Sequence, residues 1–535
     1  MRPLMLALLG GVLVAPMPAE AYVALMAGQS ARPLRGSFNN VPVLHSNQPE
    51  EVLGPGILVD TRPGSAIAAE NNQPLANATY TFNGEFGLHV HHKYYPEDRS
   101  RIRGNNGRRG ELTLATILIN PGSQPVHIRF KKGAVRNSFE APYLANNLMG
   151  VKPLGPRPWN TGPGDATAVQ MLRGQLDRRL EDEITIPAHS RIVLFSTALP
   201  ALGIANGLLK GRSDGPFQMA VVAARDPRND ADILAVLDSR RLAPGRIYLS
   251  RVRQIQNGTV FSRVAGVALG DSYQASLSHD LSQGALHVPL TSTNRHHFGT
   301  NEVQVNPLAA RMIDSSLDNV GTYGVRFDVE LNLQGAGPHQ LVFSHPTPNG
   351  KNFTAFRGSI GIETDEGYRE VHVGMRSGQS LPLTALNLKP GQNNPVRVSL
   401  VYPADATPGH LLSVVPDAQL AQLRQRESLL AAAQAAKPKP APAIPPAADP
   451  PVAVKKPAAA PAPAPVAAKP KPTPPKPRPA VVATPGWLQP LPPVPVLQGL
   501  PPAVITPTRM SQSLMERYQQ AVQAQQQLMN SLMGR

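Results

Sequence analysis

The residues whose spacing most readily permits chemistry are three histidines in the sequence Leu-His-Val-His-His-Lys at residues 88–93. Successive side chains of a β-strand point to opposite faces, so His89 and His91 would share one face while His92 lies on the other. Two imidazoles placed in this way can ligate one transition-metal ion. A complete site needs further ligands, for which the candidates are His296, His297, Glu97 and Asp98. The pattern permits a metal site, but histidines that only form hydrogen bonds near a strand end fit it better.

A second candidate is a cluster of arginines around the sequence Gly-Asn-Asn-Gly at residues 104–107. It consists of Arg99, Arg101, Arg103, Arg108 and Arg109. Guanidinium groups pair with planar anions in a bidentate manner, so this loop could hold sulfate, phosphate or uronate groups of a polysaccharide. Asp98 and Glu111 flank the cluster and partly neutralise it, which leaves a solvated hairpin tip as the simpler interpretation.

Two motifs resemble parts of hydrolase sites. Residues 270–273 (Gly-Asp-Ser-Tyr) imitate the nucleophile block of one esterase family, in which the block lies in the first strand and an Asp-x-x-His follows late in the chain. Here the block lies mid-chain, and Asp405 and His410 have the wrong spacing. The acidic run at 181–183 does not single out the two carboxylates that a glycosidase needs across a cleft. We expect no catalytic residue and no cofactor, and keep a hydrolase assembled from distant residues as an alternative.

The elements that would position these residues are predominantly β-strands. Two stretches predict the same unit of strand, turn and strand: residues 112–119, 120–123 and 126–130, and residues 324–333, 334–337 and 339–343. In the second stretch apolar and polar residues alternate, which places one face in a core and the other in water. Each unit is followed by a turn that leads into a further strand, near residues 186–195 and 388–401. The pattern predicts one or two antiparallel β-sandwiches, Ig-like or jelly-roll-like, and is consistent with an internal duplication.

The division of the folded part follows from helical signals between the strands. Residues 30–228 are expected to form a first β-sandwich unit and residues 246–415 a second one. Residues 229–245 are expected to form a connecting helix, because Ile233, Leu234, Val236 and Leu237 have helical spacing and Pro244 follows. Asp417 can cap a further helix over residues 416–436.

The N-terminus has the pattern of a secretory signal peptide at residues 1–21. Arg2 precedes an apolar run over residues 4–14, and Ala-Glu-Ala at 19–21 fits a cleavage site. The apolar run is about half the length that spans a bilayer, so no membrane-spanning segment is expected after its removal. The chain contains no cysteine, which excludes disulfides, zinc–thiolate sites and a lipid-modified N-terminus.

The C-terminal region differs from the rest in composition. Residues 437–509 contain nine lysines and arginines against one aspartate, which contributes much of the net charge of +16, and most of their remainder is proline and alanine. Such a segment cannot bury enough apolar area to fold and favours extended polyproline II, so we predict a disordered tether. Residues 510–535 are expected to form an amphipathic helix. Its partner face would consist of Leu514, Tyr518, Val522, Leu528 and Leu532.

Several strings resemble an exported cyanobacterial family that is catalogued only as a domain of unknown function, DUF3370. They are Arg-Pro-Leu-Arg-Gly at 32–36, Asn-Val-Pro-Val-Leu at 40–44, Gly-Pro-Gly-Asp at 162–165, Arg-Val-Ala-Gly-Val at 263–267, Thr-Tyr-Gly-Val at 322–325, Phe-Arg-Gly at 356–358 and Tyr-Pro-Ala-Asp-Ala-Thr at 402–407. The resemblance covers about residues 30–415 and implies an envelope location without a mechanism.

These patterns together favour a non-enzymatic protein of the cell envelope, located in the periplasm or outside the cell. We expect the β-rich part to bind a protein or polysaccharide partner, the basic tether to contact anionic cell wall, and the terminal helix to engage an envelope protein. No nucleic-acid partner is expected. A periplasmic metal-binding protein that uses His89, His91 and His92 is the second alternative.

Overall fold

The computed structural model describes residues 31–47, 52–97, 111–143, 149–157, 160–345, 353–404, 406–423, 425 and 429. All of them belong to one compact unit, Met1–Lys437, whereas Pro438–Arg535 form a second unit outside the described residues. The predicted signal peptide (1–21), the tether (437–509) and the terminal helix (510–535) therefore lie outside the described residues.

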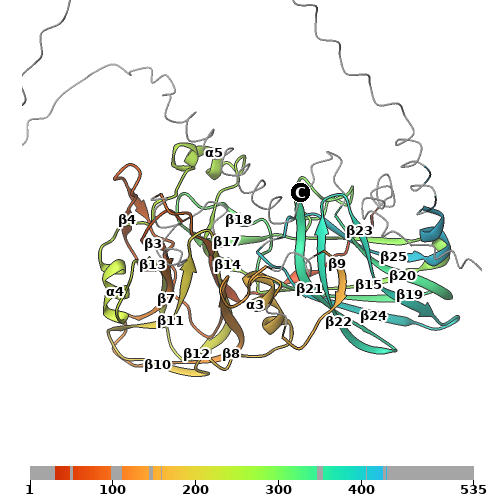
Figure 1. The fold of residues 1–535 in the computed structure, drawn as a ribbon, viewed down its shortest axis with the longest axis horizontal. Helices are drawn as coiled ribbons and strands as arrows, with labels where there is room; N and C mark the ends of the chain where they lie inside the picture. The colour runs from red at the N-terminus through yellow and green to blue at the C-terminus, as the bar shows by residue number, and fades with distance from the viewer. Residues whose placement is uncertain are drawn as a thin grey trace, which may run out of the picture. The chain divides into compact units, whose positions relative to one another are not determined.

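A first β-sandwich is formed by two sheets that enclose one apolar core (Figure 1). The larger sheet contains, in spatial order, β10 (Glu183–Ile186), β8 (Val126–Asn137), β12 (Ile204–Ser213), β6 (Glu85–Lys93), β2 (Pro42–Asn47), β14 (Val264–Leu269), β17 (Asn306–Arg311) and β18 (Asp318–Asn319). The smaller sheet contains β11 (Ser190–Pro200), β7 (Glu111–Asn120), β13 (Gln218–Ala224) and β3 (Gly56–Asp60). β4 (Ser65–Ile67) and β5 (Pro74–Ala76) follow β3 in the sequence and form a short antiparallel pair.

A second β-sandwich encloses its own core. Its larger sheet contains, in spatial order, β1 (Ser37–Phe38), β15 (Ser272–Asp280), β19 (Arg326–Gln334), β24 (Asn394–Val401), β21 (Thr354–Thr364), β22 (Gly367–Arg376) and β9 (Gly150–Pro153). The smaller sheet contains β16 (Leu286–Leu290), β25 (His410–Pro416), β20 (Gly337–Ser344) and β23 (Ser380–Leu388). The predicted alternation is present in β19, where Phe327, Val329, Leu331 and Leu333 are buried. The prediction of a mainly β fold is confirmed.

The sheets do not follow the predicted division of the chain near residue 245. β14, β17 and β18 come from the expected second unit but belong to the first sandwich, while β1 and β9 come from the expected first unit and extend the second sandwich. β14 is nearly all buried, which suits a strand in the middle of a covered sheet better than an edge. Two neighbouring pairs, β2 with β6 and β15 with β19, are also parallel, so the sheets are mixed and not purely antiparallel as expected.

The two sandwiches repeat the same connectivity. In the first sandwich β7 leads into β8 of the facing sheet, and later in the chain β10 pairs with β8 and β11 pairs with β7. In the second sandwich β19 leads into β20 of the facing sheet, and later β23 pairs with β20 and β24 pairs with β19. In each sandwich one asparagine joins the two connections that cross between the sheets, which are β7–β8 and β10–β11 in the first sandwich and β19–β20 and β23–β24 in the second. Asn120 donates hydrogen bonds to the carbonyls of Gln124, Ile186 and Pro187, and Asn394 donates to those of Leu333, Lys389 and Gln392. This agreement supports an internal duplication.

The helices cover the sandwiches. α4 (Asp230–Asp238) begins at Asn229, whose side chain accepts a hydrogen bond from the amide of Asp232, and it buries Ile233 and Leu237 in the first core. It is shorter than the predicted helix at 229–245, because Arg240 adopts a positive φ directly after it. Residues 417–423 are helical and place Leu420 against the second sandwich's smaller sheet. A short α5 (Val252–Gln256) and two 3₁₀ turns complete the described helices. Among the described residues, none of the helices has the length and apolar composition needed to cross a bilayer.

The helix α3 (Pro163–Leu172) lies between the two sandwiches, and all ten of its residues are buried. It contacts β8 and β12 of the first sandwich and β21 and β24 of the second. Asp165 accepts hydrogen bonds from Ser359 Oγ (2.9 Å) and His372 Nδ1 (2.9 Å), which are directly opposite each other on β21 and β22. At the other end Arg173 forms an ion pair with Glu370 (2.6 Å). Polar side chains therefore fix both ends of this buried helix to the second sandwich.

We predict that Asp165→Ala lowers the free energy of unfolding by about 2–4 kcal/mol, since Ser359 and His372 would then lose their buried partner. Glu181→Ala, which removes an exposed carboxylate, should change it by less than about 0.5 kcal/mol. Urea unfolding followed by circular dichroism measures both values. Equal effects of the two substitutions would contradict the role given to Asp165.

Candidate functional site

The three histidines predicted as metal ligands lie on β6, but each has a different partner. His89 Nδ1 lies 3.3 Å from His45 Nδ1 on the neighbouring strand β2. His91 Nδ1 donates to Asn206 Oδ1 at 2.8 Å, which requires a proton on this nitrogen because an amide oxygen only accepts. His92 Nε2 pairs with Ser46 Oγ at 2.8 Å. The described residues contain no group of three or more His, Asp or Glu side chains placed to hold a metal ion.

These histidines connect the first sandwich to α3. Asn206, the partner of His91, donates a hydrogen bond from Nδ2 to Thr167 Oγ1 of the helix. Thr167 in turn donates to the backbone carbonyls of Pro163 and Gly164. On the same side of β6, His89 lies against Tyr323 and Gly324. The histidine run therefore has a structural role in a buried polar chain, which agrees with the simpler interpretation of its sequence.

An aspartate, a histidine and a serine meet at Asp165, but not in the arrangement of a nucleophilic triad. Ser359 donates to Asp165 and not to His372, so the histidine is not placed to remove the serine proton. All three side chains are buried. The arrangement joins α3 to the sheet and gives no nucleophile access to a substrate.

The predicted anion-binding arginines Arg99, Arg101, Arg103, Arg108 and Arg109 lie outside the described residues, as do Leu514, Tyr518, Val522, Leu528 and Leu532 of the predicted partner helix. Ser272 and Asp271 of the esterase-like motif are described: Asp271 forms an ion pair with Lys210 (2.7 Å) and a hydrogen bond with Asn39. His410 instead pairs with Tyr402 at 2.7 Å. These residues therefore serve separate contacts and form no common site.

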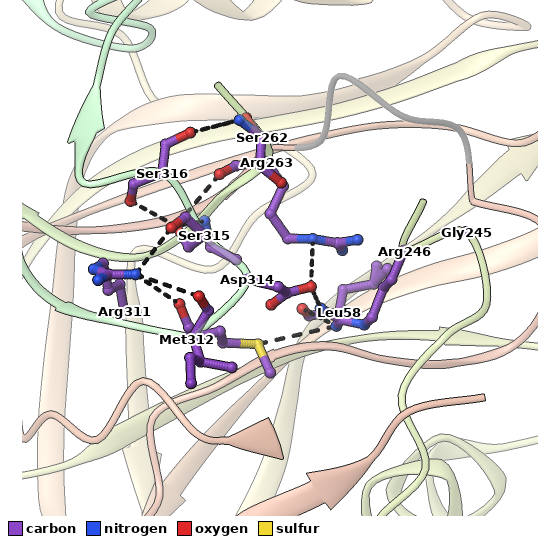
Figure 2. A network of polar contacts seen from close by, with 12 residues as sticks. Leu58, Gly245, Arg246, Ser262, Arg263, Arg311, Met312, Asp314, Ser315 and Ser316 are labelled. Atoms are coloured by element: carbon purple, nitrogen blue, oxygen red, sulfur yellow. Dashed lines mark hydrogen bonds and ion pairs between the residues drawn. The ribbon is translucent and has the colours of Figure 1, made fainter. Parts of the chain in front are cut away.

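A buried cluster of charges, which we call the arginine clamp, consists of Arg246, Asp314 and Arg263 (Figure 2). Both guanidinium groups point at the one carboxylate: Arg246 Nη1 lies 2.7 Å from Asp314 Oδ2, and Arg263 Nε lies 3.1 Å from the same oxygen. All three side chains are at most 3% exposed. Arg246 also donates to the carbonyl of Leu58. The clamp thus joins three segments that lie far apart in the sequence.

Two positive charges around one negative charge dominate the electrostatics of the clamp. Burial tends to raise the pKa of Asp314, but the attraction of Arg246 and Arg263 outweighs it and lowers this pKa below its usual value. Burial and the charge of Arg263 lower the pKa of Arg246, although a guanidinium stays protonated in proteins. Burial is the main cause that keeps the pKa of His92 well below its usual value, and repulsion by the charges of His91, Arg263 and Arg246 lowers it further. The neighbouring histidine is therefore neutral and adds no further positive charge.

Buried serine side chains form further hydrogen bonds beside the clamp. Ser316 Oγ accepts from the amide of Ser262 and donates to its carbonyl, and Ser315 Oγ accepts from the amide of Ala265 (Figure 2). Arg311 Nη1 donates to the carbonyl of Ser315. These bonds hold the segments 261–265 and 312–318 side by side in one arrangement.

The segments held by the clamp form one wall of an apolar groove of about 340 Å³. Its apolar lining includes Ile255, Val260, Phe261, Val303, Val305, Leu317, Val320, Tyr323 and Pro408. Phe261 is 40% exposed and Val303 47%, although both are large apolar side chains. Arg295, His296 and Asp318 add polar groups to the lining. Exposed apolar side chains beside a hollow with a few polar groups are typical of a binding site.

The titratable groups of the groove indicate an environment that disfavours charge. Burial lowers the pKa of His296, and the charge of Arg295 lowers it further. Burial raises the pKa of Asp318, although Arg311 opposes this. Both shifts favour the neutral forms, so the groove suits an apolar group better than an ion.

Sequence reasoning missed the groove and the clamp. The arginines and the aspartate of the clamp are 17 or more residues apart in the chain, so no local spacing connects them. Arg263, Asp165, Tyr323 and Tyr402 do occur in strings that carry the family resemblance, but those strings do not indicate what the residues contact.

We predict that Asp314→Asn lowers the free energy of unfolding by about 3–5 kcal/mol, because two buried guanidinium groups would lose their counter-charge. Arg263→Met should lower the free energy of unfolding by less, since it leaves Arg246 and Asp314 as an ion pair with no net charge. Urea unfolding of the two variants measures the difference. An equal or larger loss in Arg263→Met would show that Asp314 is not the centre of the clamp.

Buried histidines predict loss of stability in mild acid. Burial lowers the pKa values of seven described histidines: His45 (about 3), His287 and His345 (about 4), His89, His92 and His410, which lie well below the usual value, and His296. Only the unfolded chain takes up these protons below about pH 6.5, so stability is complete above that pH and falls as the pH drops towards the folded pKa values. Each histidine contributes up to about 1.4 kcal/mol per pH unit.

Urea unfolding at several pH values between 7.5 and 5 tests this slope. His92→Gln should reduce the slope of the free energy of unfolding against pH by the contribution of about one proton. His127→Gln, which removes an exposed histidine, should leave this slope unchanged. A flat profile for the wild type, or an unchanged slope in His92→Gln, would contradict the account.

Comparison with known families gives one result. Residues 29–416 match the family model described as "Protein of unknown function (DUF3370)". No curated protein matches the chain. The matched range contains both sandwiches, α3, the clamp and the groove.

Proposed function

Since the chain belongs to the DUF3370 family, whose description assigns no activity, we propose from the groove that this protein is a non-catalytic binding module of the cell envelope. The observation that carries the proposal is the apolar groove with the exposed side chains of Phe261 and Val303. Its size suits one or two apolar side chains of a protein partner. The polar groups of the lining would fix the orientation of that partner, while the apolar side chains supply the binding free energy.

The sequence supports an envelope location for this module. The pattern of residues 1–21 fits an export signal, and the basic composition of residues 437–509 suits contact with anionic wall polymer. In extended polyproline II the tether could reach on the order of 200 Å. Weak electrostatic contacts along the wall would raise the effective concentration of the module near an envelope partner. The predicted helix at 510–535 would add a second point of contact.

The division of labour between module and tether leads to a sedimentation experiment with isolated cell-wall sacculi. Three proteins are compared: the mature chain, a version that ends at Ala436, and the mature chain with Phe261→Ser. Both described cores lie before residue 437, so the shortened version retains them. We expect the mature chain and Phe261→Ser to pellet equally and to be released by salt, because charge in the tether carries the contact. The shortened version should stay in solution.

Equal pelleting of the shortened version would show that the folded module itself binds the wall. If only Phe261→Ser failed to pellet, the groove and not the tether would contact the wall polymer. If none of the three pelleted, the basic segment would be only a spacer. Each of these results would contradict the proposed division.

A further inference from the structure

Tyr368, on the outer face of β22, is a large aromatic side chain that is 57% exposed. Its ring lies against the backbone of Gly361 on the neighbouring strand β21. A Cβ atom at Gly361 would come within 2.5 Å of Tyr368 Oη and 3.1 Å of two ring carbons, so a larger residue there would displace the ring. The ring therefore has one face against the sheet and much of its remaining surface open to solvent.

A chain of polar contacts fixes the edge of this ring. Tyr368 Oη donates a hydrogen bond to Glu370 Oε1 at 3.1 Å. Glu370 Oε2 is held by Arg173 at the end of α3 (2.6 Å), and Arg173 also donates to the carbonyls of Gly155 and Pro156. Burial and the charge of Glu370 raise the pKa of Tyr368 to about 12, so the phenol keeps its proton. The ring is thus held in one orientation before any ligand binds.

The ring borders a hollow of about 640 Å³ between the edges of β22, β9 and β23. Four charged side chains line it, two basic and two acidic: Lys152, Arg369, Glu366 and Glu370. Arg369 is oriented by a hydrogen bond to Thr384 Oγ1 (2.8 Å). The volume lies in the range of sites for small ligands. The balanced charges do not favour a polyanion, and their number does not favour a purely apolar ligand.

From this arrangement we infer that Tyr368 and its polar neighbours bind a neutral carbohydrate chain. One face of a sugar ring presents C–H groups, which are attracted to the negative face of an aromatic ring. Its hydroxyl groups both donate and accept hydrogen bonds, so they need donors such as Lys152 and Arg369 together with acceptors such as Glu366. A ring that is already fixed loses little conformational freedom on binding, which favours affinity. This site is formed by other residues than the apolar groove and does not depend on it.

The test is calorimetric titration of the mature protein with three tetrasaccharide probes: cellotetraose, the N-acetylglucosamine tetramer and the galacturonic acid tetramer. We expect at least one neutral tetramer to bind at millimolar concentration or below. Tyr368→Ala should weaken its binding at least about tenfold, whereas Tyr368→Trp should retain it. Phe139→Ala removes a side chain that is equally exposed, at 57%, and should have no effect.

Binding of neither neutral tetramer, or equal binding by the wild type and Tyr368→Ala, would overturn the assignment. Preferred binding of the galacturonic acid tetramer would overturn the neutral class of ligand. If Tyr368→Ala has an altered thermal unfolding curve, Glu366→Ala replaces it, because Glu366 is exposed and should also weaken binding. Phe261→Ser should leave sugar binding unchanged, so failure here and failure of the groove are distinguishable.

Discussion

Buried carboxylates that need partners determine how this protein is held together. An unpaired charge inside a protein is very unfavourable, so each buried aspartate requires a defined set of donors around it. Asp165 joins α3 to β21 and β22 through Ser359 and His372. Asp314 joins the segments around Arg246 and Arg263. The contact of Asp165 holds α3 against the second sandwich, and the contacts of Asp314 join segments that border the groove.

The two sandwiches share one connectivity. The corner asparagines Asn120 and Asn394 perform the same task from opposite connections, since each donates to carbonyls of both crossing loops. Each sandwich also contains strands from the half of the chain that forms most of the other sandwich. These are β14, β17 and β18 in the first sandwich and β1 and β9 in the second. Because both sandwiches take strands from both parts of the chain and α3 packs between them, the folded module requires the whole range of residues 29–416.

Local patterns predicted part of this structure and long-range contacts decided the rest. Alternation in β19 and the connecting helix from residue 229 follow from neighbouring residues, and both are present, the helix in a shorter form. The helix α3 was not predicted, because Gly162 and Pro163 indicate a turn and its residues have little amphipathic pattern; it is buried on all sides. His89, His91 and His92 were correctly placed on a strand, but their partners His45, Asn206 and Ser46 come from other parts of the chain. The clamp and the ring of Tyr368 also depend on pairings that sequence spacing does not reveal.

The central claim is that the groove beside Phe261 is where an envelope partner binds. Site-specific photo-crosslinking in the cells that produce the protein tests it most directly, with the photoreactive residue at position 261 and, as a control, at position 139, whose side chain is more exposed. The account predicts a discrete cross-linked product from position 261, its loss when Val303→Asp is added, and no such product from position 139. The same pattern of products from both positions, or none from position 261, would contradict it.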